Sequence, residues 1–468
     1  MSEMQIAGRK LEPAQAVIDG VLRVAGPGGC VVVVSDTTEV DLRFAVNTMT
    51  TNGVRRHRRV TVIRFGAKND SISAGISSST GNADTADLVA AAEADAETSA
   101  PADDAAELVE GGAAYDFGEP PSETEPAIFD GVLASLGGAF DRARSAGRVL
   151  SGYAEHSVTT TYLGTSTGTR KRNVLPTGKI ELVARDSLGT RSSWMGRGSS
   201  DFSGIDLDAG EARLAERLSW ADRQIEIPAG RYQVLMPPDA VADLVIMLGD
   251  ATSGREAEEG RNVFSAPGGG TLLGQSITGI PFDLLSDPRA PGLECTPFEI
   301  ATETTSDVSV FDNGIDLEPT YWLKGGTLER LRYHRAGAAR SGQRPTPPIG
   351  NLILEVPGAT ATLESMIAST DRALLLTCLW YIREVDPMTL LLTGLTRDGV
   401  YLVEHGEIVG AVNNFRFNES PVDMLAKTVE VARTERALSR EWNEWFNRTA
   451  MPSLRVDDFN MSSVSQAT

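Results

Sequence analysis

The chain has 468 residues, of which 41% are apolar, and a formal net charge of −21. This length predicts two or three domains with sizeable cores. No run of eighteen apolar residues occurs, and the N-terminus lacks the apolar stretch of a secretory signal, which argues against membrane insertion and export. The excess of acid would repel a phosphate backbone. We therefore expect a cytoplasmic protein that binds neither membranes nor nucleic acid.

The cysteines and the basic residues add two smaller expectations. Cys30, Cys295 and Cys378 are far apart and form no C-x-x-C pair, which predicts reduced thiols that are buried as small apolar side chains. The basic clusters at 55–59 and 170–172 lie beside predicted strands, and we interpret them as solvated edges or hairpins.

Residues 1–115 are predicted to form an N-terminal α/β domain. The helical spacing of apolar residues predicts a helix at 11–25, and an alanine-rich stretch predicts another at 85–98. Strands are expected at 30–35, 40–47 and 59–66. Turn residues at 51–53 predict a chain reversal there, and so antiparallel pairing. The end of this domain is acidic and is predicted to be flexible.

Residues 116–126 are predicted to be a mobile linker, because this acidic segment with two prolines has little apolar surface to bury. A central α/β domain is expected over 127–226. Its predicted elements are helices at 128–147 and 208–223 and strands at 149–163 and 179–185.

The remaining residues, 227–468, alternate short strand-like segments with turns, which predicts a β-rich C-terminal domain. Helices are expected at 238–248 and 421–435. Strands are expected at 231–236, 307–316, 351–356, 371–383 and 398–411. Strands dominate without a regular β–α–β alternation, so we predict an α+β fold with mixed, mainly antiparallel sheets and flanking helices.

The residues alone identify no catalytic site. The four histidines are His57, His156, His334 and His405, and none has another within three to five residues, so no helical zinc-binding pair is present. His405 lies in a predicted hairpin turn. No G-x-S-x-G motif occurs. The glycines at 268–270 lack the ending of a phosphate-binding loop and are interpreted as a flexible loop.

The C-terminal third resembles the TldD/PmbA metallopeptidase family in several successive blocks. They lie at 351–370, 371–377, 385–389, 399–411 and 451–456. Upstream, the residues at 287–292, 311–314 and 332–337 follow the family's order, and 41–47 resembles the strand that opens these proteins. The order and spacing of the blocks carry the resemblance, which covers nearly the whole chain.

The family's zinc motif is the point at which this chain departs from the resemblance. Catalytic members carry H-E-x-x-x-H on a helix and a cysteine near the C-terminus. The counterpart helix at 238–254 has Val245 at the first histidine, Ile246 at the glutamate and Asp250 at the second histidine. Valine and isoleucine neither bind zinc nor act as a base. No cysteine occurs between 437 and 455 to complete the site.

The resemblance therefore implies a non-catalytic TldE/PmbA-type subunit without a zinc site or other cofactor of its own. The implied partner is a zinc-bearing TldD-like homologue, with which the chain would process peptides or unfolded proteins, held by strand addition to a sheet edge. Two alternatives stay open. The chain could be a peptidase with an unrecognised site, or a peptide-binding scaffold without a peptidase partner. The isolated chain could form a homodimer.

Overall fold

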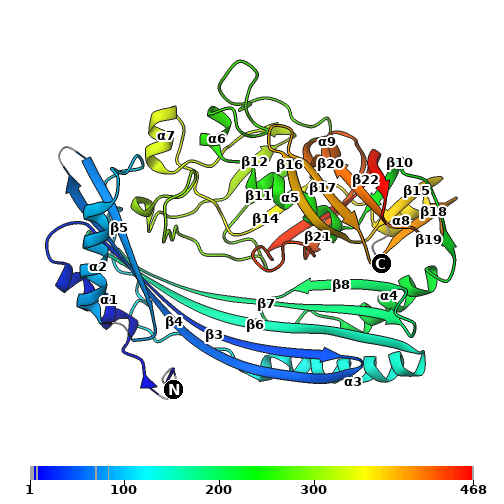
Figure 1. The fold of residues 1–468 in the computed structure, drawn as a ribbon, viewed down its shortest axis with the longest axis horizontal. Coiled ribbons are helices and arrows are strands. Elements are labelled where there is room, and N and C mark those ends of the chain that lie inside the picture. Colours follow the sequence, from blue (N-terminus) through cyan, green and yellow to red (C-terminus); the bar gives the residue numbers. More distant parts are fainter. Residues whose placement is uncertain (1–4, 7–8, 69–70, 83, 466–468) are drawn as a thin grey trace.

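The computed structural model describes residues 5–6, 9–68, 71–82 and 84–465. It contains a long, curved antiparallel sheet, and a strand-rich C-terminal body lies over the concave face of this sheet (Figure 1). Antiparallel and mixed sheets with flanking helices confirm the predicted α+β class. None of the helices in the described part of the chain is both long enough and apolar enough to traverse a lipid bilayer.

The curved sheet has six strands in the order β5-β4-β3-β6-β7-β8. Their bounds are β3 (Cys30–Ala45), β4 (Thr48–Lys68), β5 (Ser71–Thr80), β6 (Arg148–Thr165), β7 (Arg170–Asp186) and β8 (Ser192–Gly198). A separate pair of two-residue strands precedes them, β1 (Gln5–Ile6) and β2 (Arg9–Lys10). The central pairing joins β3 to β6, so segments on both sides of the predicted linker contribute to one sheet.

Both faces of this sheet are buried at the start of β3, which explains the unbroken apolar run at 30–34. Because side chains alternate along a strand, Val32 and Val34 pack against helices on the outer face, whereas Val31 and Val33 pack against the C-terminal body. Strands buried on both faces are apolar at successive positions rather than at alternate ones.

Four helices cover the outer face. They are α1 (Ala14–Ala25), α2 (Thr85–Thr98), α3 (Asp130–Ser145) and α4 (Leu207–Trp220), and each confirms a predicted helix. Asp84 caps α2 and Asp206 caps α4, and each accepts hydrogen bonds from backbone N–H groups of the first turn, as expected for an N-cap aspartate. A 3₁₀ turn, η1 (Pro126–Phe129), precedes α3.

The predicted reversal at 51–53 is wrong, because β3 and β4 continue past it and turn at Val46 and Asn47. Both turn residues have positive φ, as a two-residue hairpin loop requires. The Asn47 side chain donates to the Arg148 carbonyl at 2.8 Å and accepts from the Leu150 N–H at 2.6 Å. The turn is thus fixed by β6, a strand one hundred residues further along the chain.

We expect Asn47→Ala to lower the free energy of unfolding by about 2–3 kcal/mol, because it removes two buried hydrogen bonds and strains a left-handed residue. Chemical denaturation followed by circular dichroism measures this. Asn47→Gly is the matched control, since glycine keeps the backbone conformation and loses only the hydrogen bonds. Equal losses for the two variants would show that backbone strain contributes nothing.

The basic cluster at 55–59 lies on the β4 arm of the β3–β4 hairpin, where pairing with β5 begins only at Arg59. Most of its side chains are exposed, which agrees with the predicted solvated edge or hairpin. Arg58 is the exception, because it is buried and pairs with Asp36 on β3. The residues predicted as a linker also make specific contacts with the sheet. The Ser122 N–H donates to the hydroxyl of Thr160 on β6.

The C-terminal body contains a mixed sheet of fourteen strands. Its strands are β9 (Gln224–Ile225), β10 (Gly230–Met236), β11 (Asp283–Ser286), β12 (Thr320–Lys324), β13 (Thr327–Leu328), β14 (Leu352–Glu355), β15 (Arg372–Leu376), β16 (Leu379–Asp386), β17 (Leu391–Thr396), β18 (Val400–Glu404), β19 (Glu407–Val412), β20 (Phe415–Glu419), β21 (Thr428–Ala437) and β22 (Thr449–Val464). Its helices are α5 (Pro238–Asp250), α6 (Gly254–Glu258), α7 (Arg335–Ser341), α8 (Leu363–Ala368) and α9 (Pro421–Ala426).

Two predicted elements of this body are wrong. The helix expected at 421–435 ends at Ala426, and the following residues form β21, which pairs with β22. The strand expected at 307–316 is a loop with a short 3₁₀ turn, η2 (Val310–Asp312). The Asn313 amide holds this loop, because it bonds the backbone N–H and C=O of Ala301.

Candidate functional site

Helix α5 corresponds to the helix on which the sequence resemblance places the zinc motif. Val245 is fully buried and Ile246 is 2% exposed, and both belong to the main apolar core of the C-terminal body. Asp250 lies at the exposed end of α5, where its carboxylate is 3.6 Å from the Arg332 guanidinium. The first two positions therefore contribute packing, and the third contributes a surface ion pair.

The residues at these positions do not fit a zinc ion. Apolar side chains carry no lone pair for the metal, and zinc sites need at least three nitrogen, sulfur or oxygen ligands. Within the described ranges, no group of three or more His, Cys, Asp or Glu side chains is placed to hold a metal.

The loop that would carry the family's cysteine lies directly on α5. The buried Asp243 carboxylate accepts hydrogen bonds from the Ser439 hydroxyl at 2.6 Å and from the Glu441 N–H at 3.1 Å. The Trp442 indole donates to the Asp243 carbonyl. Burial raises the pKa of Asp243 to about 7. The 437–455 segment is thus packed on α5 through Ser439, Glu441 and Trp442, and it contains no cysteine.

A cleft of about 480 Å³ opens beside the end of α5. Its walls are largely apolar and include Ile246, Val308, Leu317, Trp322 and Ile349. Its ionisable residues are Asp250, Cys295, Glu299, Arg332 and Arg448. Concave, mostly apolar surfaces with a few polar groups are the usual form of ligand sites.

Glu299 is the unusual acid of this cleft. It is 5% exposed, and in the described part of the chain its carboxyl group has no hydrogen-bond or ion-pair partner. Burial raises the pKa of Glu299 to about 8, and the Asp312 carboxylate adds to the increase. Its backbone is fixed, because the N–H donates to Ile315 and the C=O accepts from Gly314.

Arg332 is held on one wall by two acids. Its guanidinium lies 3.0 Å from the Asp307 carboxylate and 3.6 Å from that of Asp250. It also donates to the Asp250 backbone carbonyl. Its charge is therefore compensated within the protein.

Arg448 lies where the cleft meets the curved sheet. It donates to the Pro176 carbonyl at 3.1 Å and to the Thr177 hydroxyl on β7. Burial lowers the pKa of Arg448, whereas burial raises the pKa of the neighbouring Cys295 thiol. A second cavity of about 370 Å³ shares both residues with the cleft. The two cavities therefore meet at Arg448, between the sheet and the C-terminal body.

The edge of β7 that faces this second cavity is only partly paired. Strand β8 pairs with β7 from Lys179 to Arg185. At the other end, the Arg170 N–H donates to the Gly112 carbonyl and its C=O accepts from Ala114. The outward backbone groups of β7 are therefore satisfied at its two ends by different segments.

Between these ends, part of the β7 edge is open. Backbone groups alternate in direction along a strand, so Arg172 and Val174 direct their N–H and C=O groups to the same side as Arg170. Among the described residues these groups have no backbone partner, while the next outward carbonyl, that of Pro176, accepts from Arg448. An unpaired strand edge beside a cavity can accept an extended peptide.

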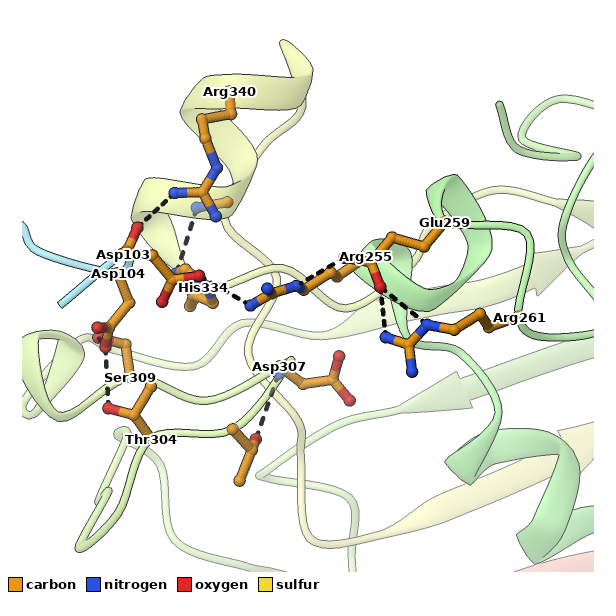
Figure 2. A network of polar contacts seen from close by, with 12 residues as sticks. Asp103, Asp104, Arg255, Glu259, Arg261, Thr304, Asp307, Ser309, His334 and Arg340 are labelled. Atoms are coloured by element: carbon orange, nitrogen blue, oxygen red, sulfur yellow. Dashed lines mark hydrogen bonds and ion pairs between the residues drawn. The ribbon is translucent and has the colours of Figure 1, made fainter. Parts of the chain in front are cut away.

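An acidic segment at 99–115, here called the strap, fixes the cleft wall to the N-terminal region (Figure 2). The Asp103 carboxylate pairs with Arg255 at 3.0 Å, and the buried Asp104 carboxylate accepts hydrogen bonds from Thr304 and Ser309. The 304–309 loop carries Val308, which lines the cleft. The stretch predicted to be flexible thus makes specific contacts.

The four histidines stay apart from the cleft. His57 is exposed on β4, and His156 is buried between Thr124 and the Ser200 carbonyl. His334 caps α7, and His405 lies in the predicted β18–β19 turn with positive φ. Cys30, Cys295 and Cys378 are all free and buried, as predicted. Gly268–Gly270 form a turn in which all three residues have positive φ.

The chain is similar to known proteins both in sequence and in fold. The profile of the PmbA/TldA metallopeptidase C-terminal domain matches residues 229–463, half of the chain. TldE from Thermococcus kodakarensis has a TM-score of 0.76 at 16% identity, over 95% of this chain and 99% of its own. A candidate modulator of a DNA gyrase from Thermotoga maritima has a TM-score of 0.75 at 18% sequence identity, over 95% of this chain and 99% of its own. A candidate modulator of DNA gyrase from Bacteroides thetaiotaomicron has a TM-score of 0.73 at 14% sequence identity, over 96% of this chain and 98% of its own.

These solved structures share the whole fold, with the curved sheet and the C-terminal body together. Curated protein sequences gave no match. The chain belongs to the PmbA/TldD metallopeptidase family.

Glu299, Arg448 and the open β7 edge were not predicted from the sequence. The one sequence signal for a buried acid is that Glu299 lies between two apolar residues, Phe298 and Ile300. This signal is weak, because acids beside apolar residues are mostly exposed. The edge depends on where β8 ends, which the local sequence does not indicate.

Proposed function

We propose that this chain is a non-catalytic, TldE-type subunit of a TldD/TldE-like peptidase complex. Its role is to bind extended peptides or unfolded protein segments and to complete an active site whose zinc is held by the partner subunit. The partner is a zinc-bearing homologue, and the complex acts in the cytoplasm.

One observation carries this proposal. This metallopeptidase-family chain has a cleft beside α5, the helix on which the sequence resemblance places the zinc motif, and Val245 and Ile246 of that helix are packed into the core. A buried valine and isoleucine stabilise a helix and provide no general base or metal ligand. Side chains that serve packing at these two positions allow the chain to bind peptides but not to carry out zinc-dependent peptide hydrolysis by itself.

The open β7 edge supports peptide binding. Backbone groups of Arg172 and Val174 would pair with any extended segment, whatever its sequence, because strand addition uses main-chain hydrogen bonds. The adjoining cavities would accept side chains of the added strand. The open edge and the cavities would therefore allow peptides of many different sequences to bind.

The test is co-expression with a zinc-bearing homologue from the same genome. We expect the two chains to co-elute in size-exclusion chromatography, and peptide cleavage to occur only with the mixture and to stop with a chelator. Val174→Pro removes an outward N–H without touching the ladder to β6, so it should lower cleavage severalfold and leave assembly intact. Val429→Thr, at an exposed position on β21, is the matched control.

Other results would reject the proposal. A homodimer that ignores the homologue would support a stand-alone peptide-binding scaffold. Chelator-insensitive cleavage by the purified chain would support a peptidase with an unrecognised site. Two of the similar structures are named for DNA gyrase, but a chain with a net charge of −21 has no general attraction for DNA.

A further inference from the structure

The cleft beside α5 contains an acid that the described residues leave without a counter-charge. The other charged wall residues have polar partners. Arg332 pairs with Asp307 and Asp250, and Arg448 donates hydrogen bonds to the Pro176 carbonyl and the Thr177 hydroxyl. Glu299 has no such partner among the described residues, although it is more than nine-tenths buried and lines the cleft. The charge that acts on Glu299 is a second carboxylate, that of Asp312, which repels it and raises its pKa.

An unpartnered buried carboxyl group costs folding free energy, because its desolvation is not repaid by hydrogen bonds. A leucine or methionine would fill the same space without this cost. Buried ionisable groups with perturbed protonation in a cleft are typical of functional sites. The arrangement therefore indicates a group that is completed by something outside the chain.

The chemistry of the cleft selects the kind of ligand. A hard metal ion needs several oxygen ligands, and no metal-binding group of three acids, histidines or cysteines is found in the described ranges. Of the two cleft carboxylates, that of Asp250 pairs with Arg332, whereas that of Glu299 has no ion pair among the described residues. A carboxylate left in this state beside aromatic walls, including Phe298 and Trp322, suits an organic cation with an aliphatic stem. An ammonium group would satisfy the carboxylate, and its methylenes would contact the walls.

We propose that Glu299 is the receptor for a primary ammonium group of a bound peptide, either a lysine side chain or the free N-terminus. This inference rests on the proposed peptide-binding function and adds a preference to it. The β7 edge would hold the peptide backbone, and the cleft would hold the cationic group.

Protonation gives the site a pH dependence with a defined sign. Because burial and Asp312 raise the pKa of Glu299 to about 8, the binding carboxylate form becomes rarer by about tenfold per pH unit below that value. Affinity for an ammonium ligand should therefore rise from pH 6 to pH 8. The other ionisable groups facing the cleft are Asp250 on α5, Cys295, Arg332 and Arg448.

The two ligand sources respond differently above pH 8. A lysine side chain keeps its proton up to about pH 10, whereas an α-amino group loses its own near pH 8. Affinity for lysine should reach a plateau, and affinity for a free N-terminus should pass through a maximum.

The experiment uses three unstructured peptides with a C-terminal fluorophore, and the full chain. The first is N-acetylated with one central lysine, the second is N-acetylated with norleucine in its place, and the third has norleucine and a free N-terminus. We expect fluorescence anisotropy to show that one ammonium peptide binds about 10- to 100-fold more tightly than the neutral peptide, the range of a charge-assisted hydrogen bond.

Glu299→Gln keeps the shape and removes the charge, so it should abolish that difference and flatten the pH profile. Glu303→Gln is the matched control, because Glu303 is exposed on the same loop and does not line the cleft. Equal binding of all three peptides to the unsubstituted chain would overturn the inference and leave the proposed function standing. Failure of every peptide to bind would overturn both. An ammonium preference that survives Glu299→Gln would assign the preference elsewhere and reject Glu299.

Discussion

Replacing Arg58 with methionine is expected to lower the free energy of unfolding by about 3–5 kcal/mol, because it leaves a buried carboxylate without its partner. Arg58 on β4 lies directly opposite Asp36 on β3. Its guanidinium bonds both carboxylate oxygens, at 2.6 and 2.7 Å, and a third N–H donates to the Glu12 carbonyl. The two side chains are 2% and 0% exposed.

Burial decides the size of this effect. Exposed ion pairs contribute at most about 1 kcal/mol, so Arg55→Met, which breaks the exposed pair with Glu39 on the same strands, is the matched control. Denaturant unfolding monitored by circular dichroism measures both. The double variant Asp36→Val/Arg58→Met should recover much of the loss, because it removes both charges together. A single Arg58 variant as stable as the Arg55 control would contradict the expectation.

This ion pair also explains why the length of β3 could not be predicted. Asp36 and Glu39 lie in the gap between the two short strands that were predicted at 30–35 and 40–47, where they interrupt the apolar pattern. In the folded chain Asp36 and Glu39 meet arginines across the hairpin. Acids inside a strand are favourable only when the register supplies cations, and the register becomes known only from the pairing of distant segments.

The longer helices, α1 to α5, were predicted well, because their signals are local, whereas the short helices α6, α7 and α8 were not predicted. The apolar spacing of 11–25 and 208–223 gave α1 and α4 to within a few residues. The error at 421–435 has a physical cause as well. Val429 and Val431 are β-branched and recur at the spacing of a strand, and pairing with β22 outweighs the helical tendency of the residues around them.

The candidate site was predictable in part. The sequence predicted a helix at 238–248, which is the first part of α5. The assignment of Val245, Ile246 and Asp250 to the family's zinc positions rests on the resemblance and stays a prediction. The cleft needs four segments that are far apart in the chain, carrying Ile246, Glu299, Arg332 and Arg448. Their convergence depends on the pairing of β14, β10 and β22, which no local pattern encodes.

Introducing the family's zinc motif into α5 is expected to destabilise the protein and to create no zinc site. The triple variant Val245→His/Ile246→Glu/Asp250→His places two polar groups at positions that are 0% and 2% exposed. Each buried polar group without a partner costs about 1–3 kcal/mol, and the lost apolar contacts add about 1–3 kcal/mol. We expect a total loss of about 4 kcal/mol or more.

Zinc would be excluded for a geometric reason as well. Position 245 is sealed in the core, position 250 lies at the open end of the helix, and the adjoining loop offers Ser439 rather than cysteine. The single variant Asp250→His is the matched control, because an exposed position should tolerate histidine at nearly unchanged stability. Thermal unfolding and elemental analysis after dialysis against zinc give the two readouts. One zinc per chain in a stable triple variant would contradict the expectation, because α5 would then tolerate a metal site despite its packing into the core.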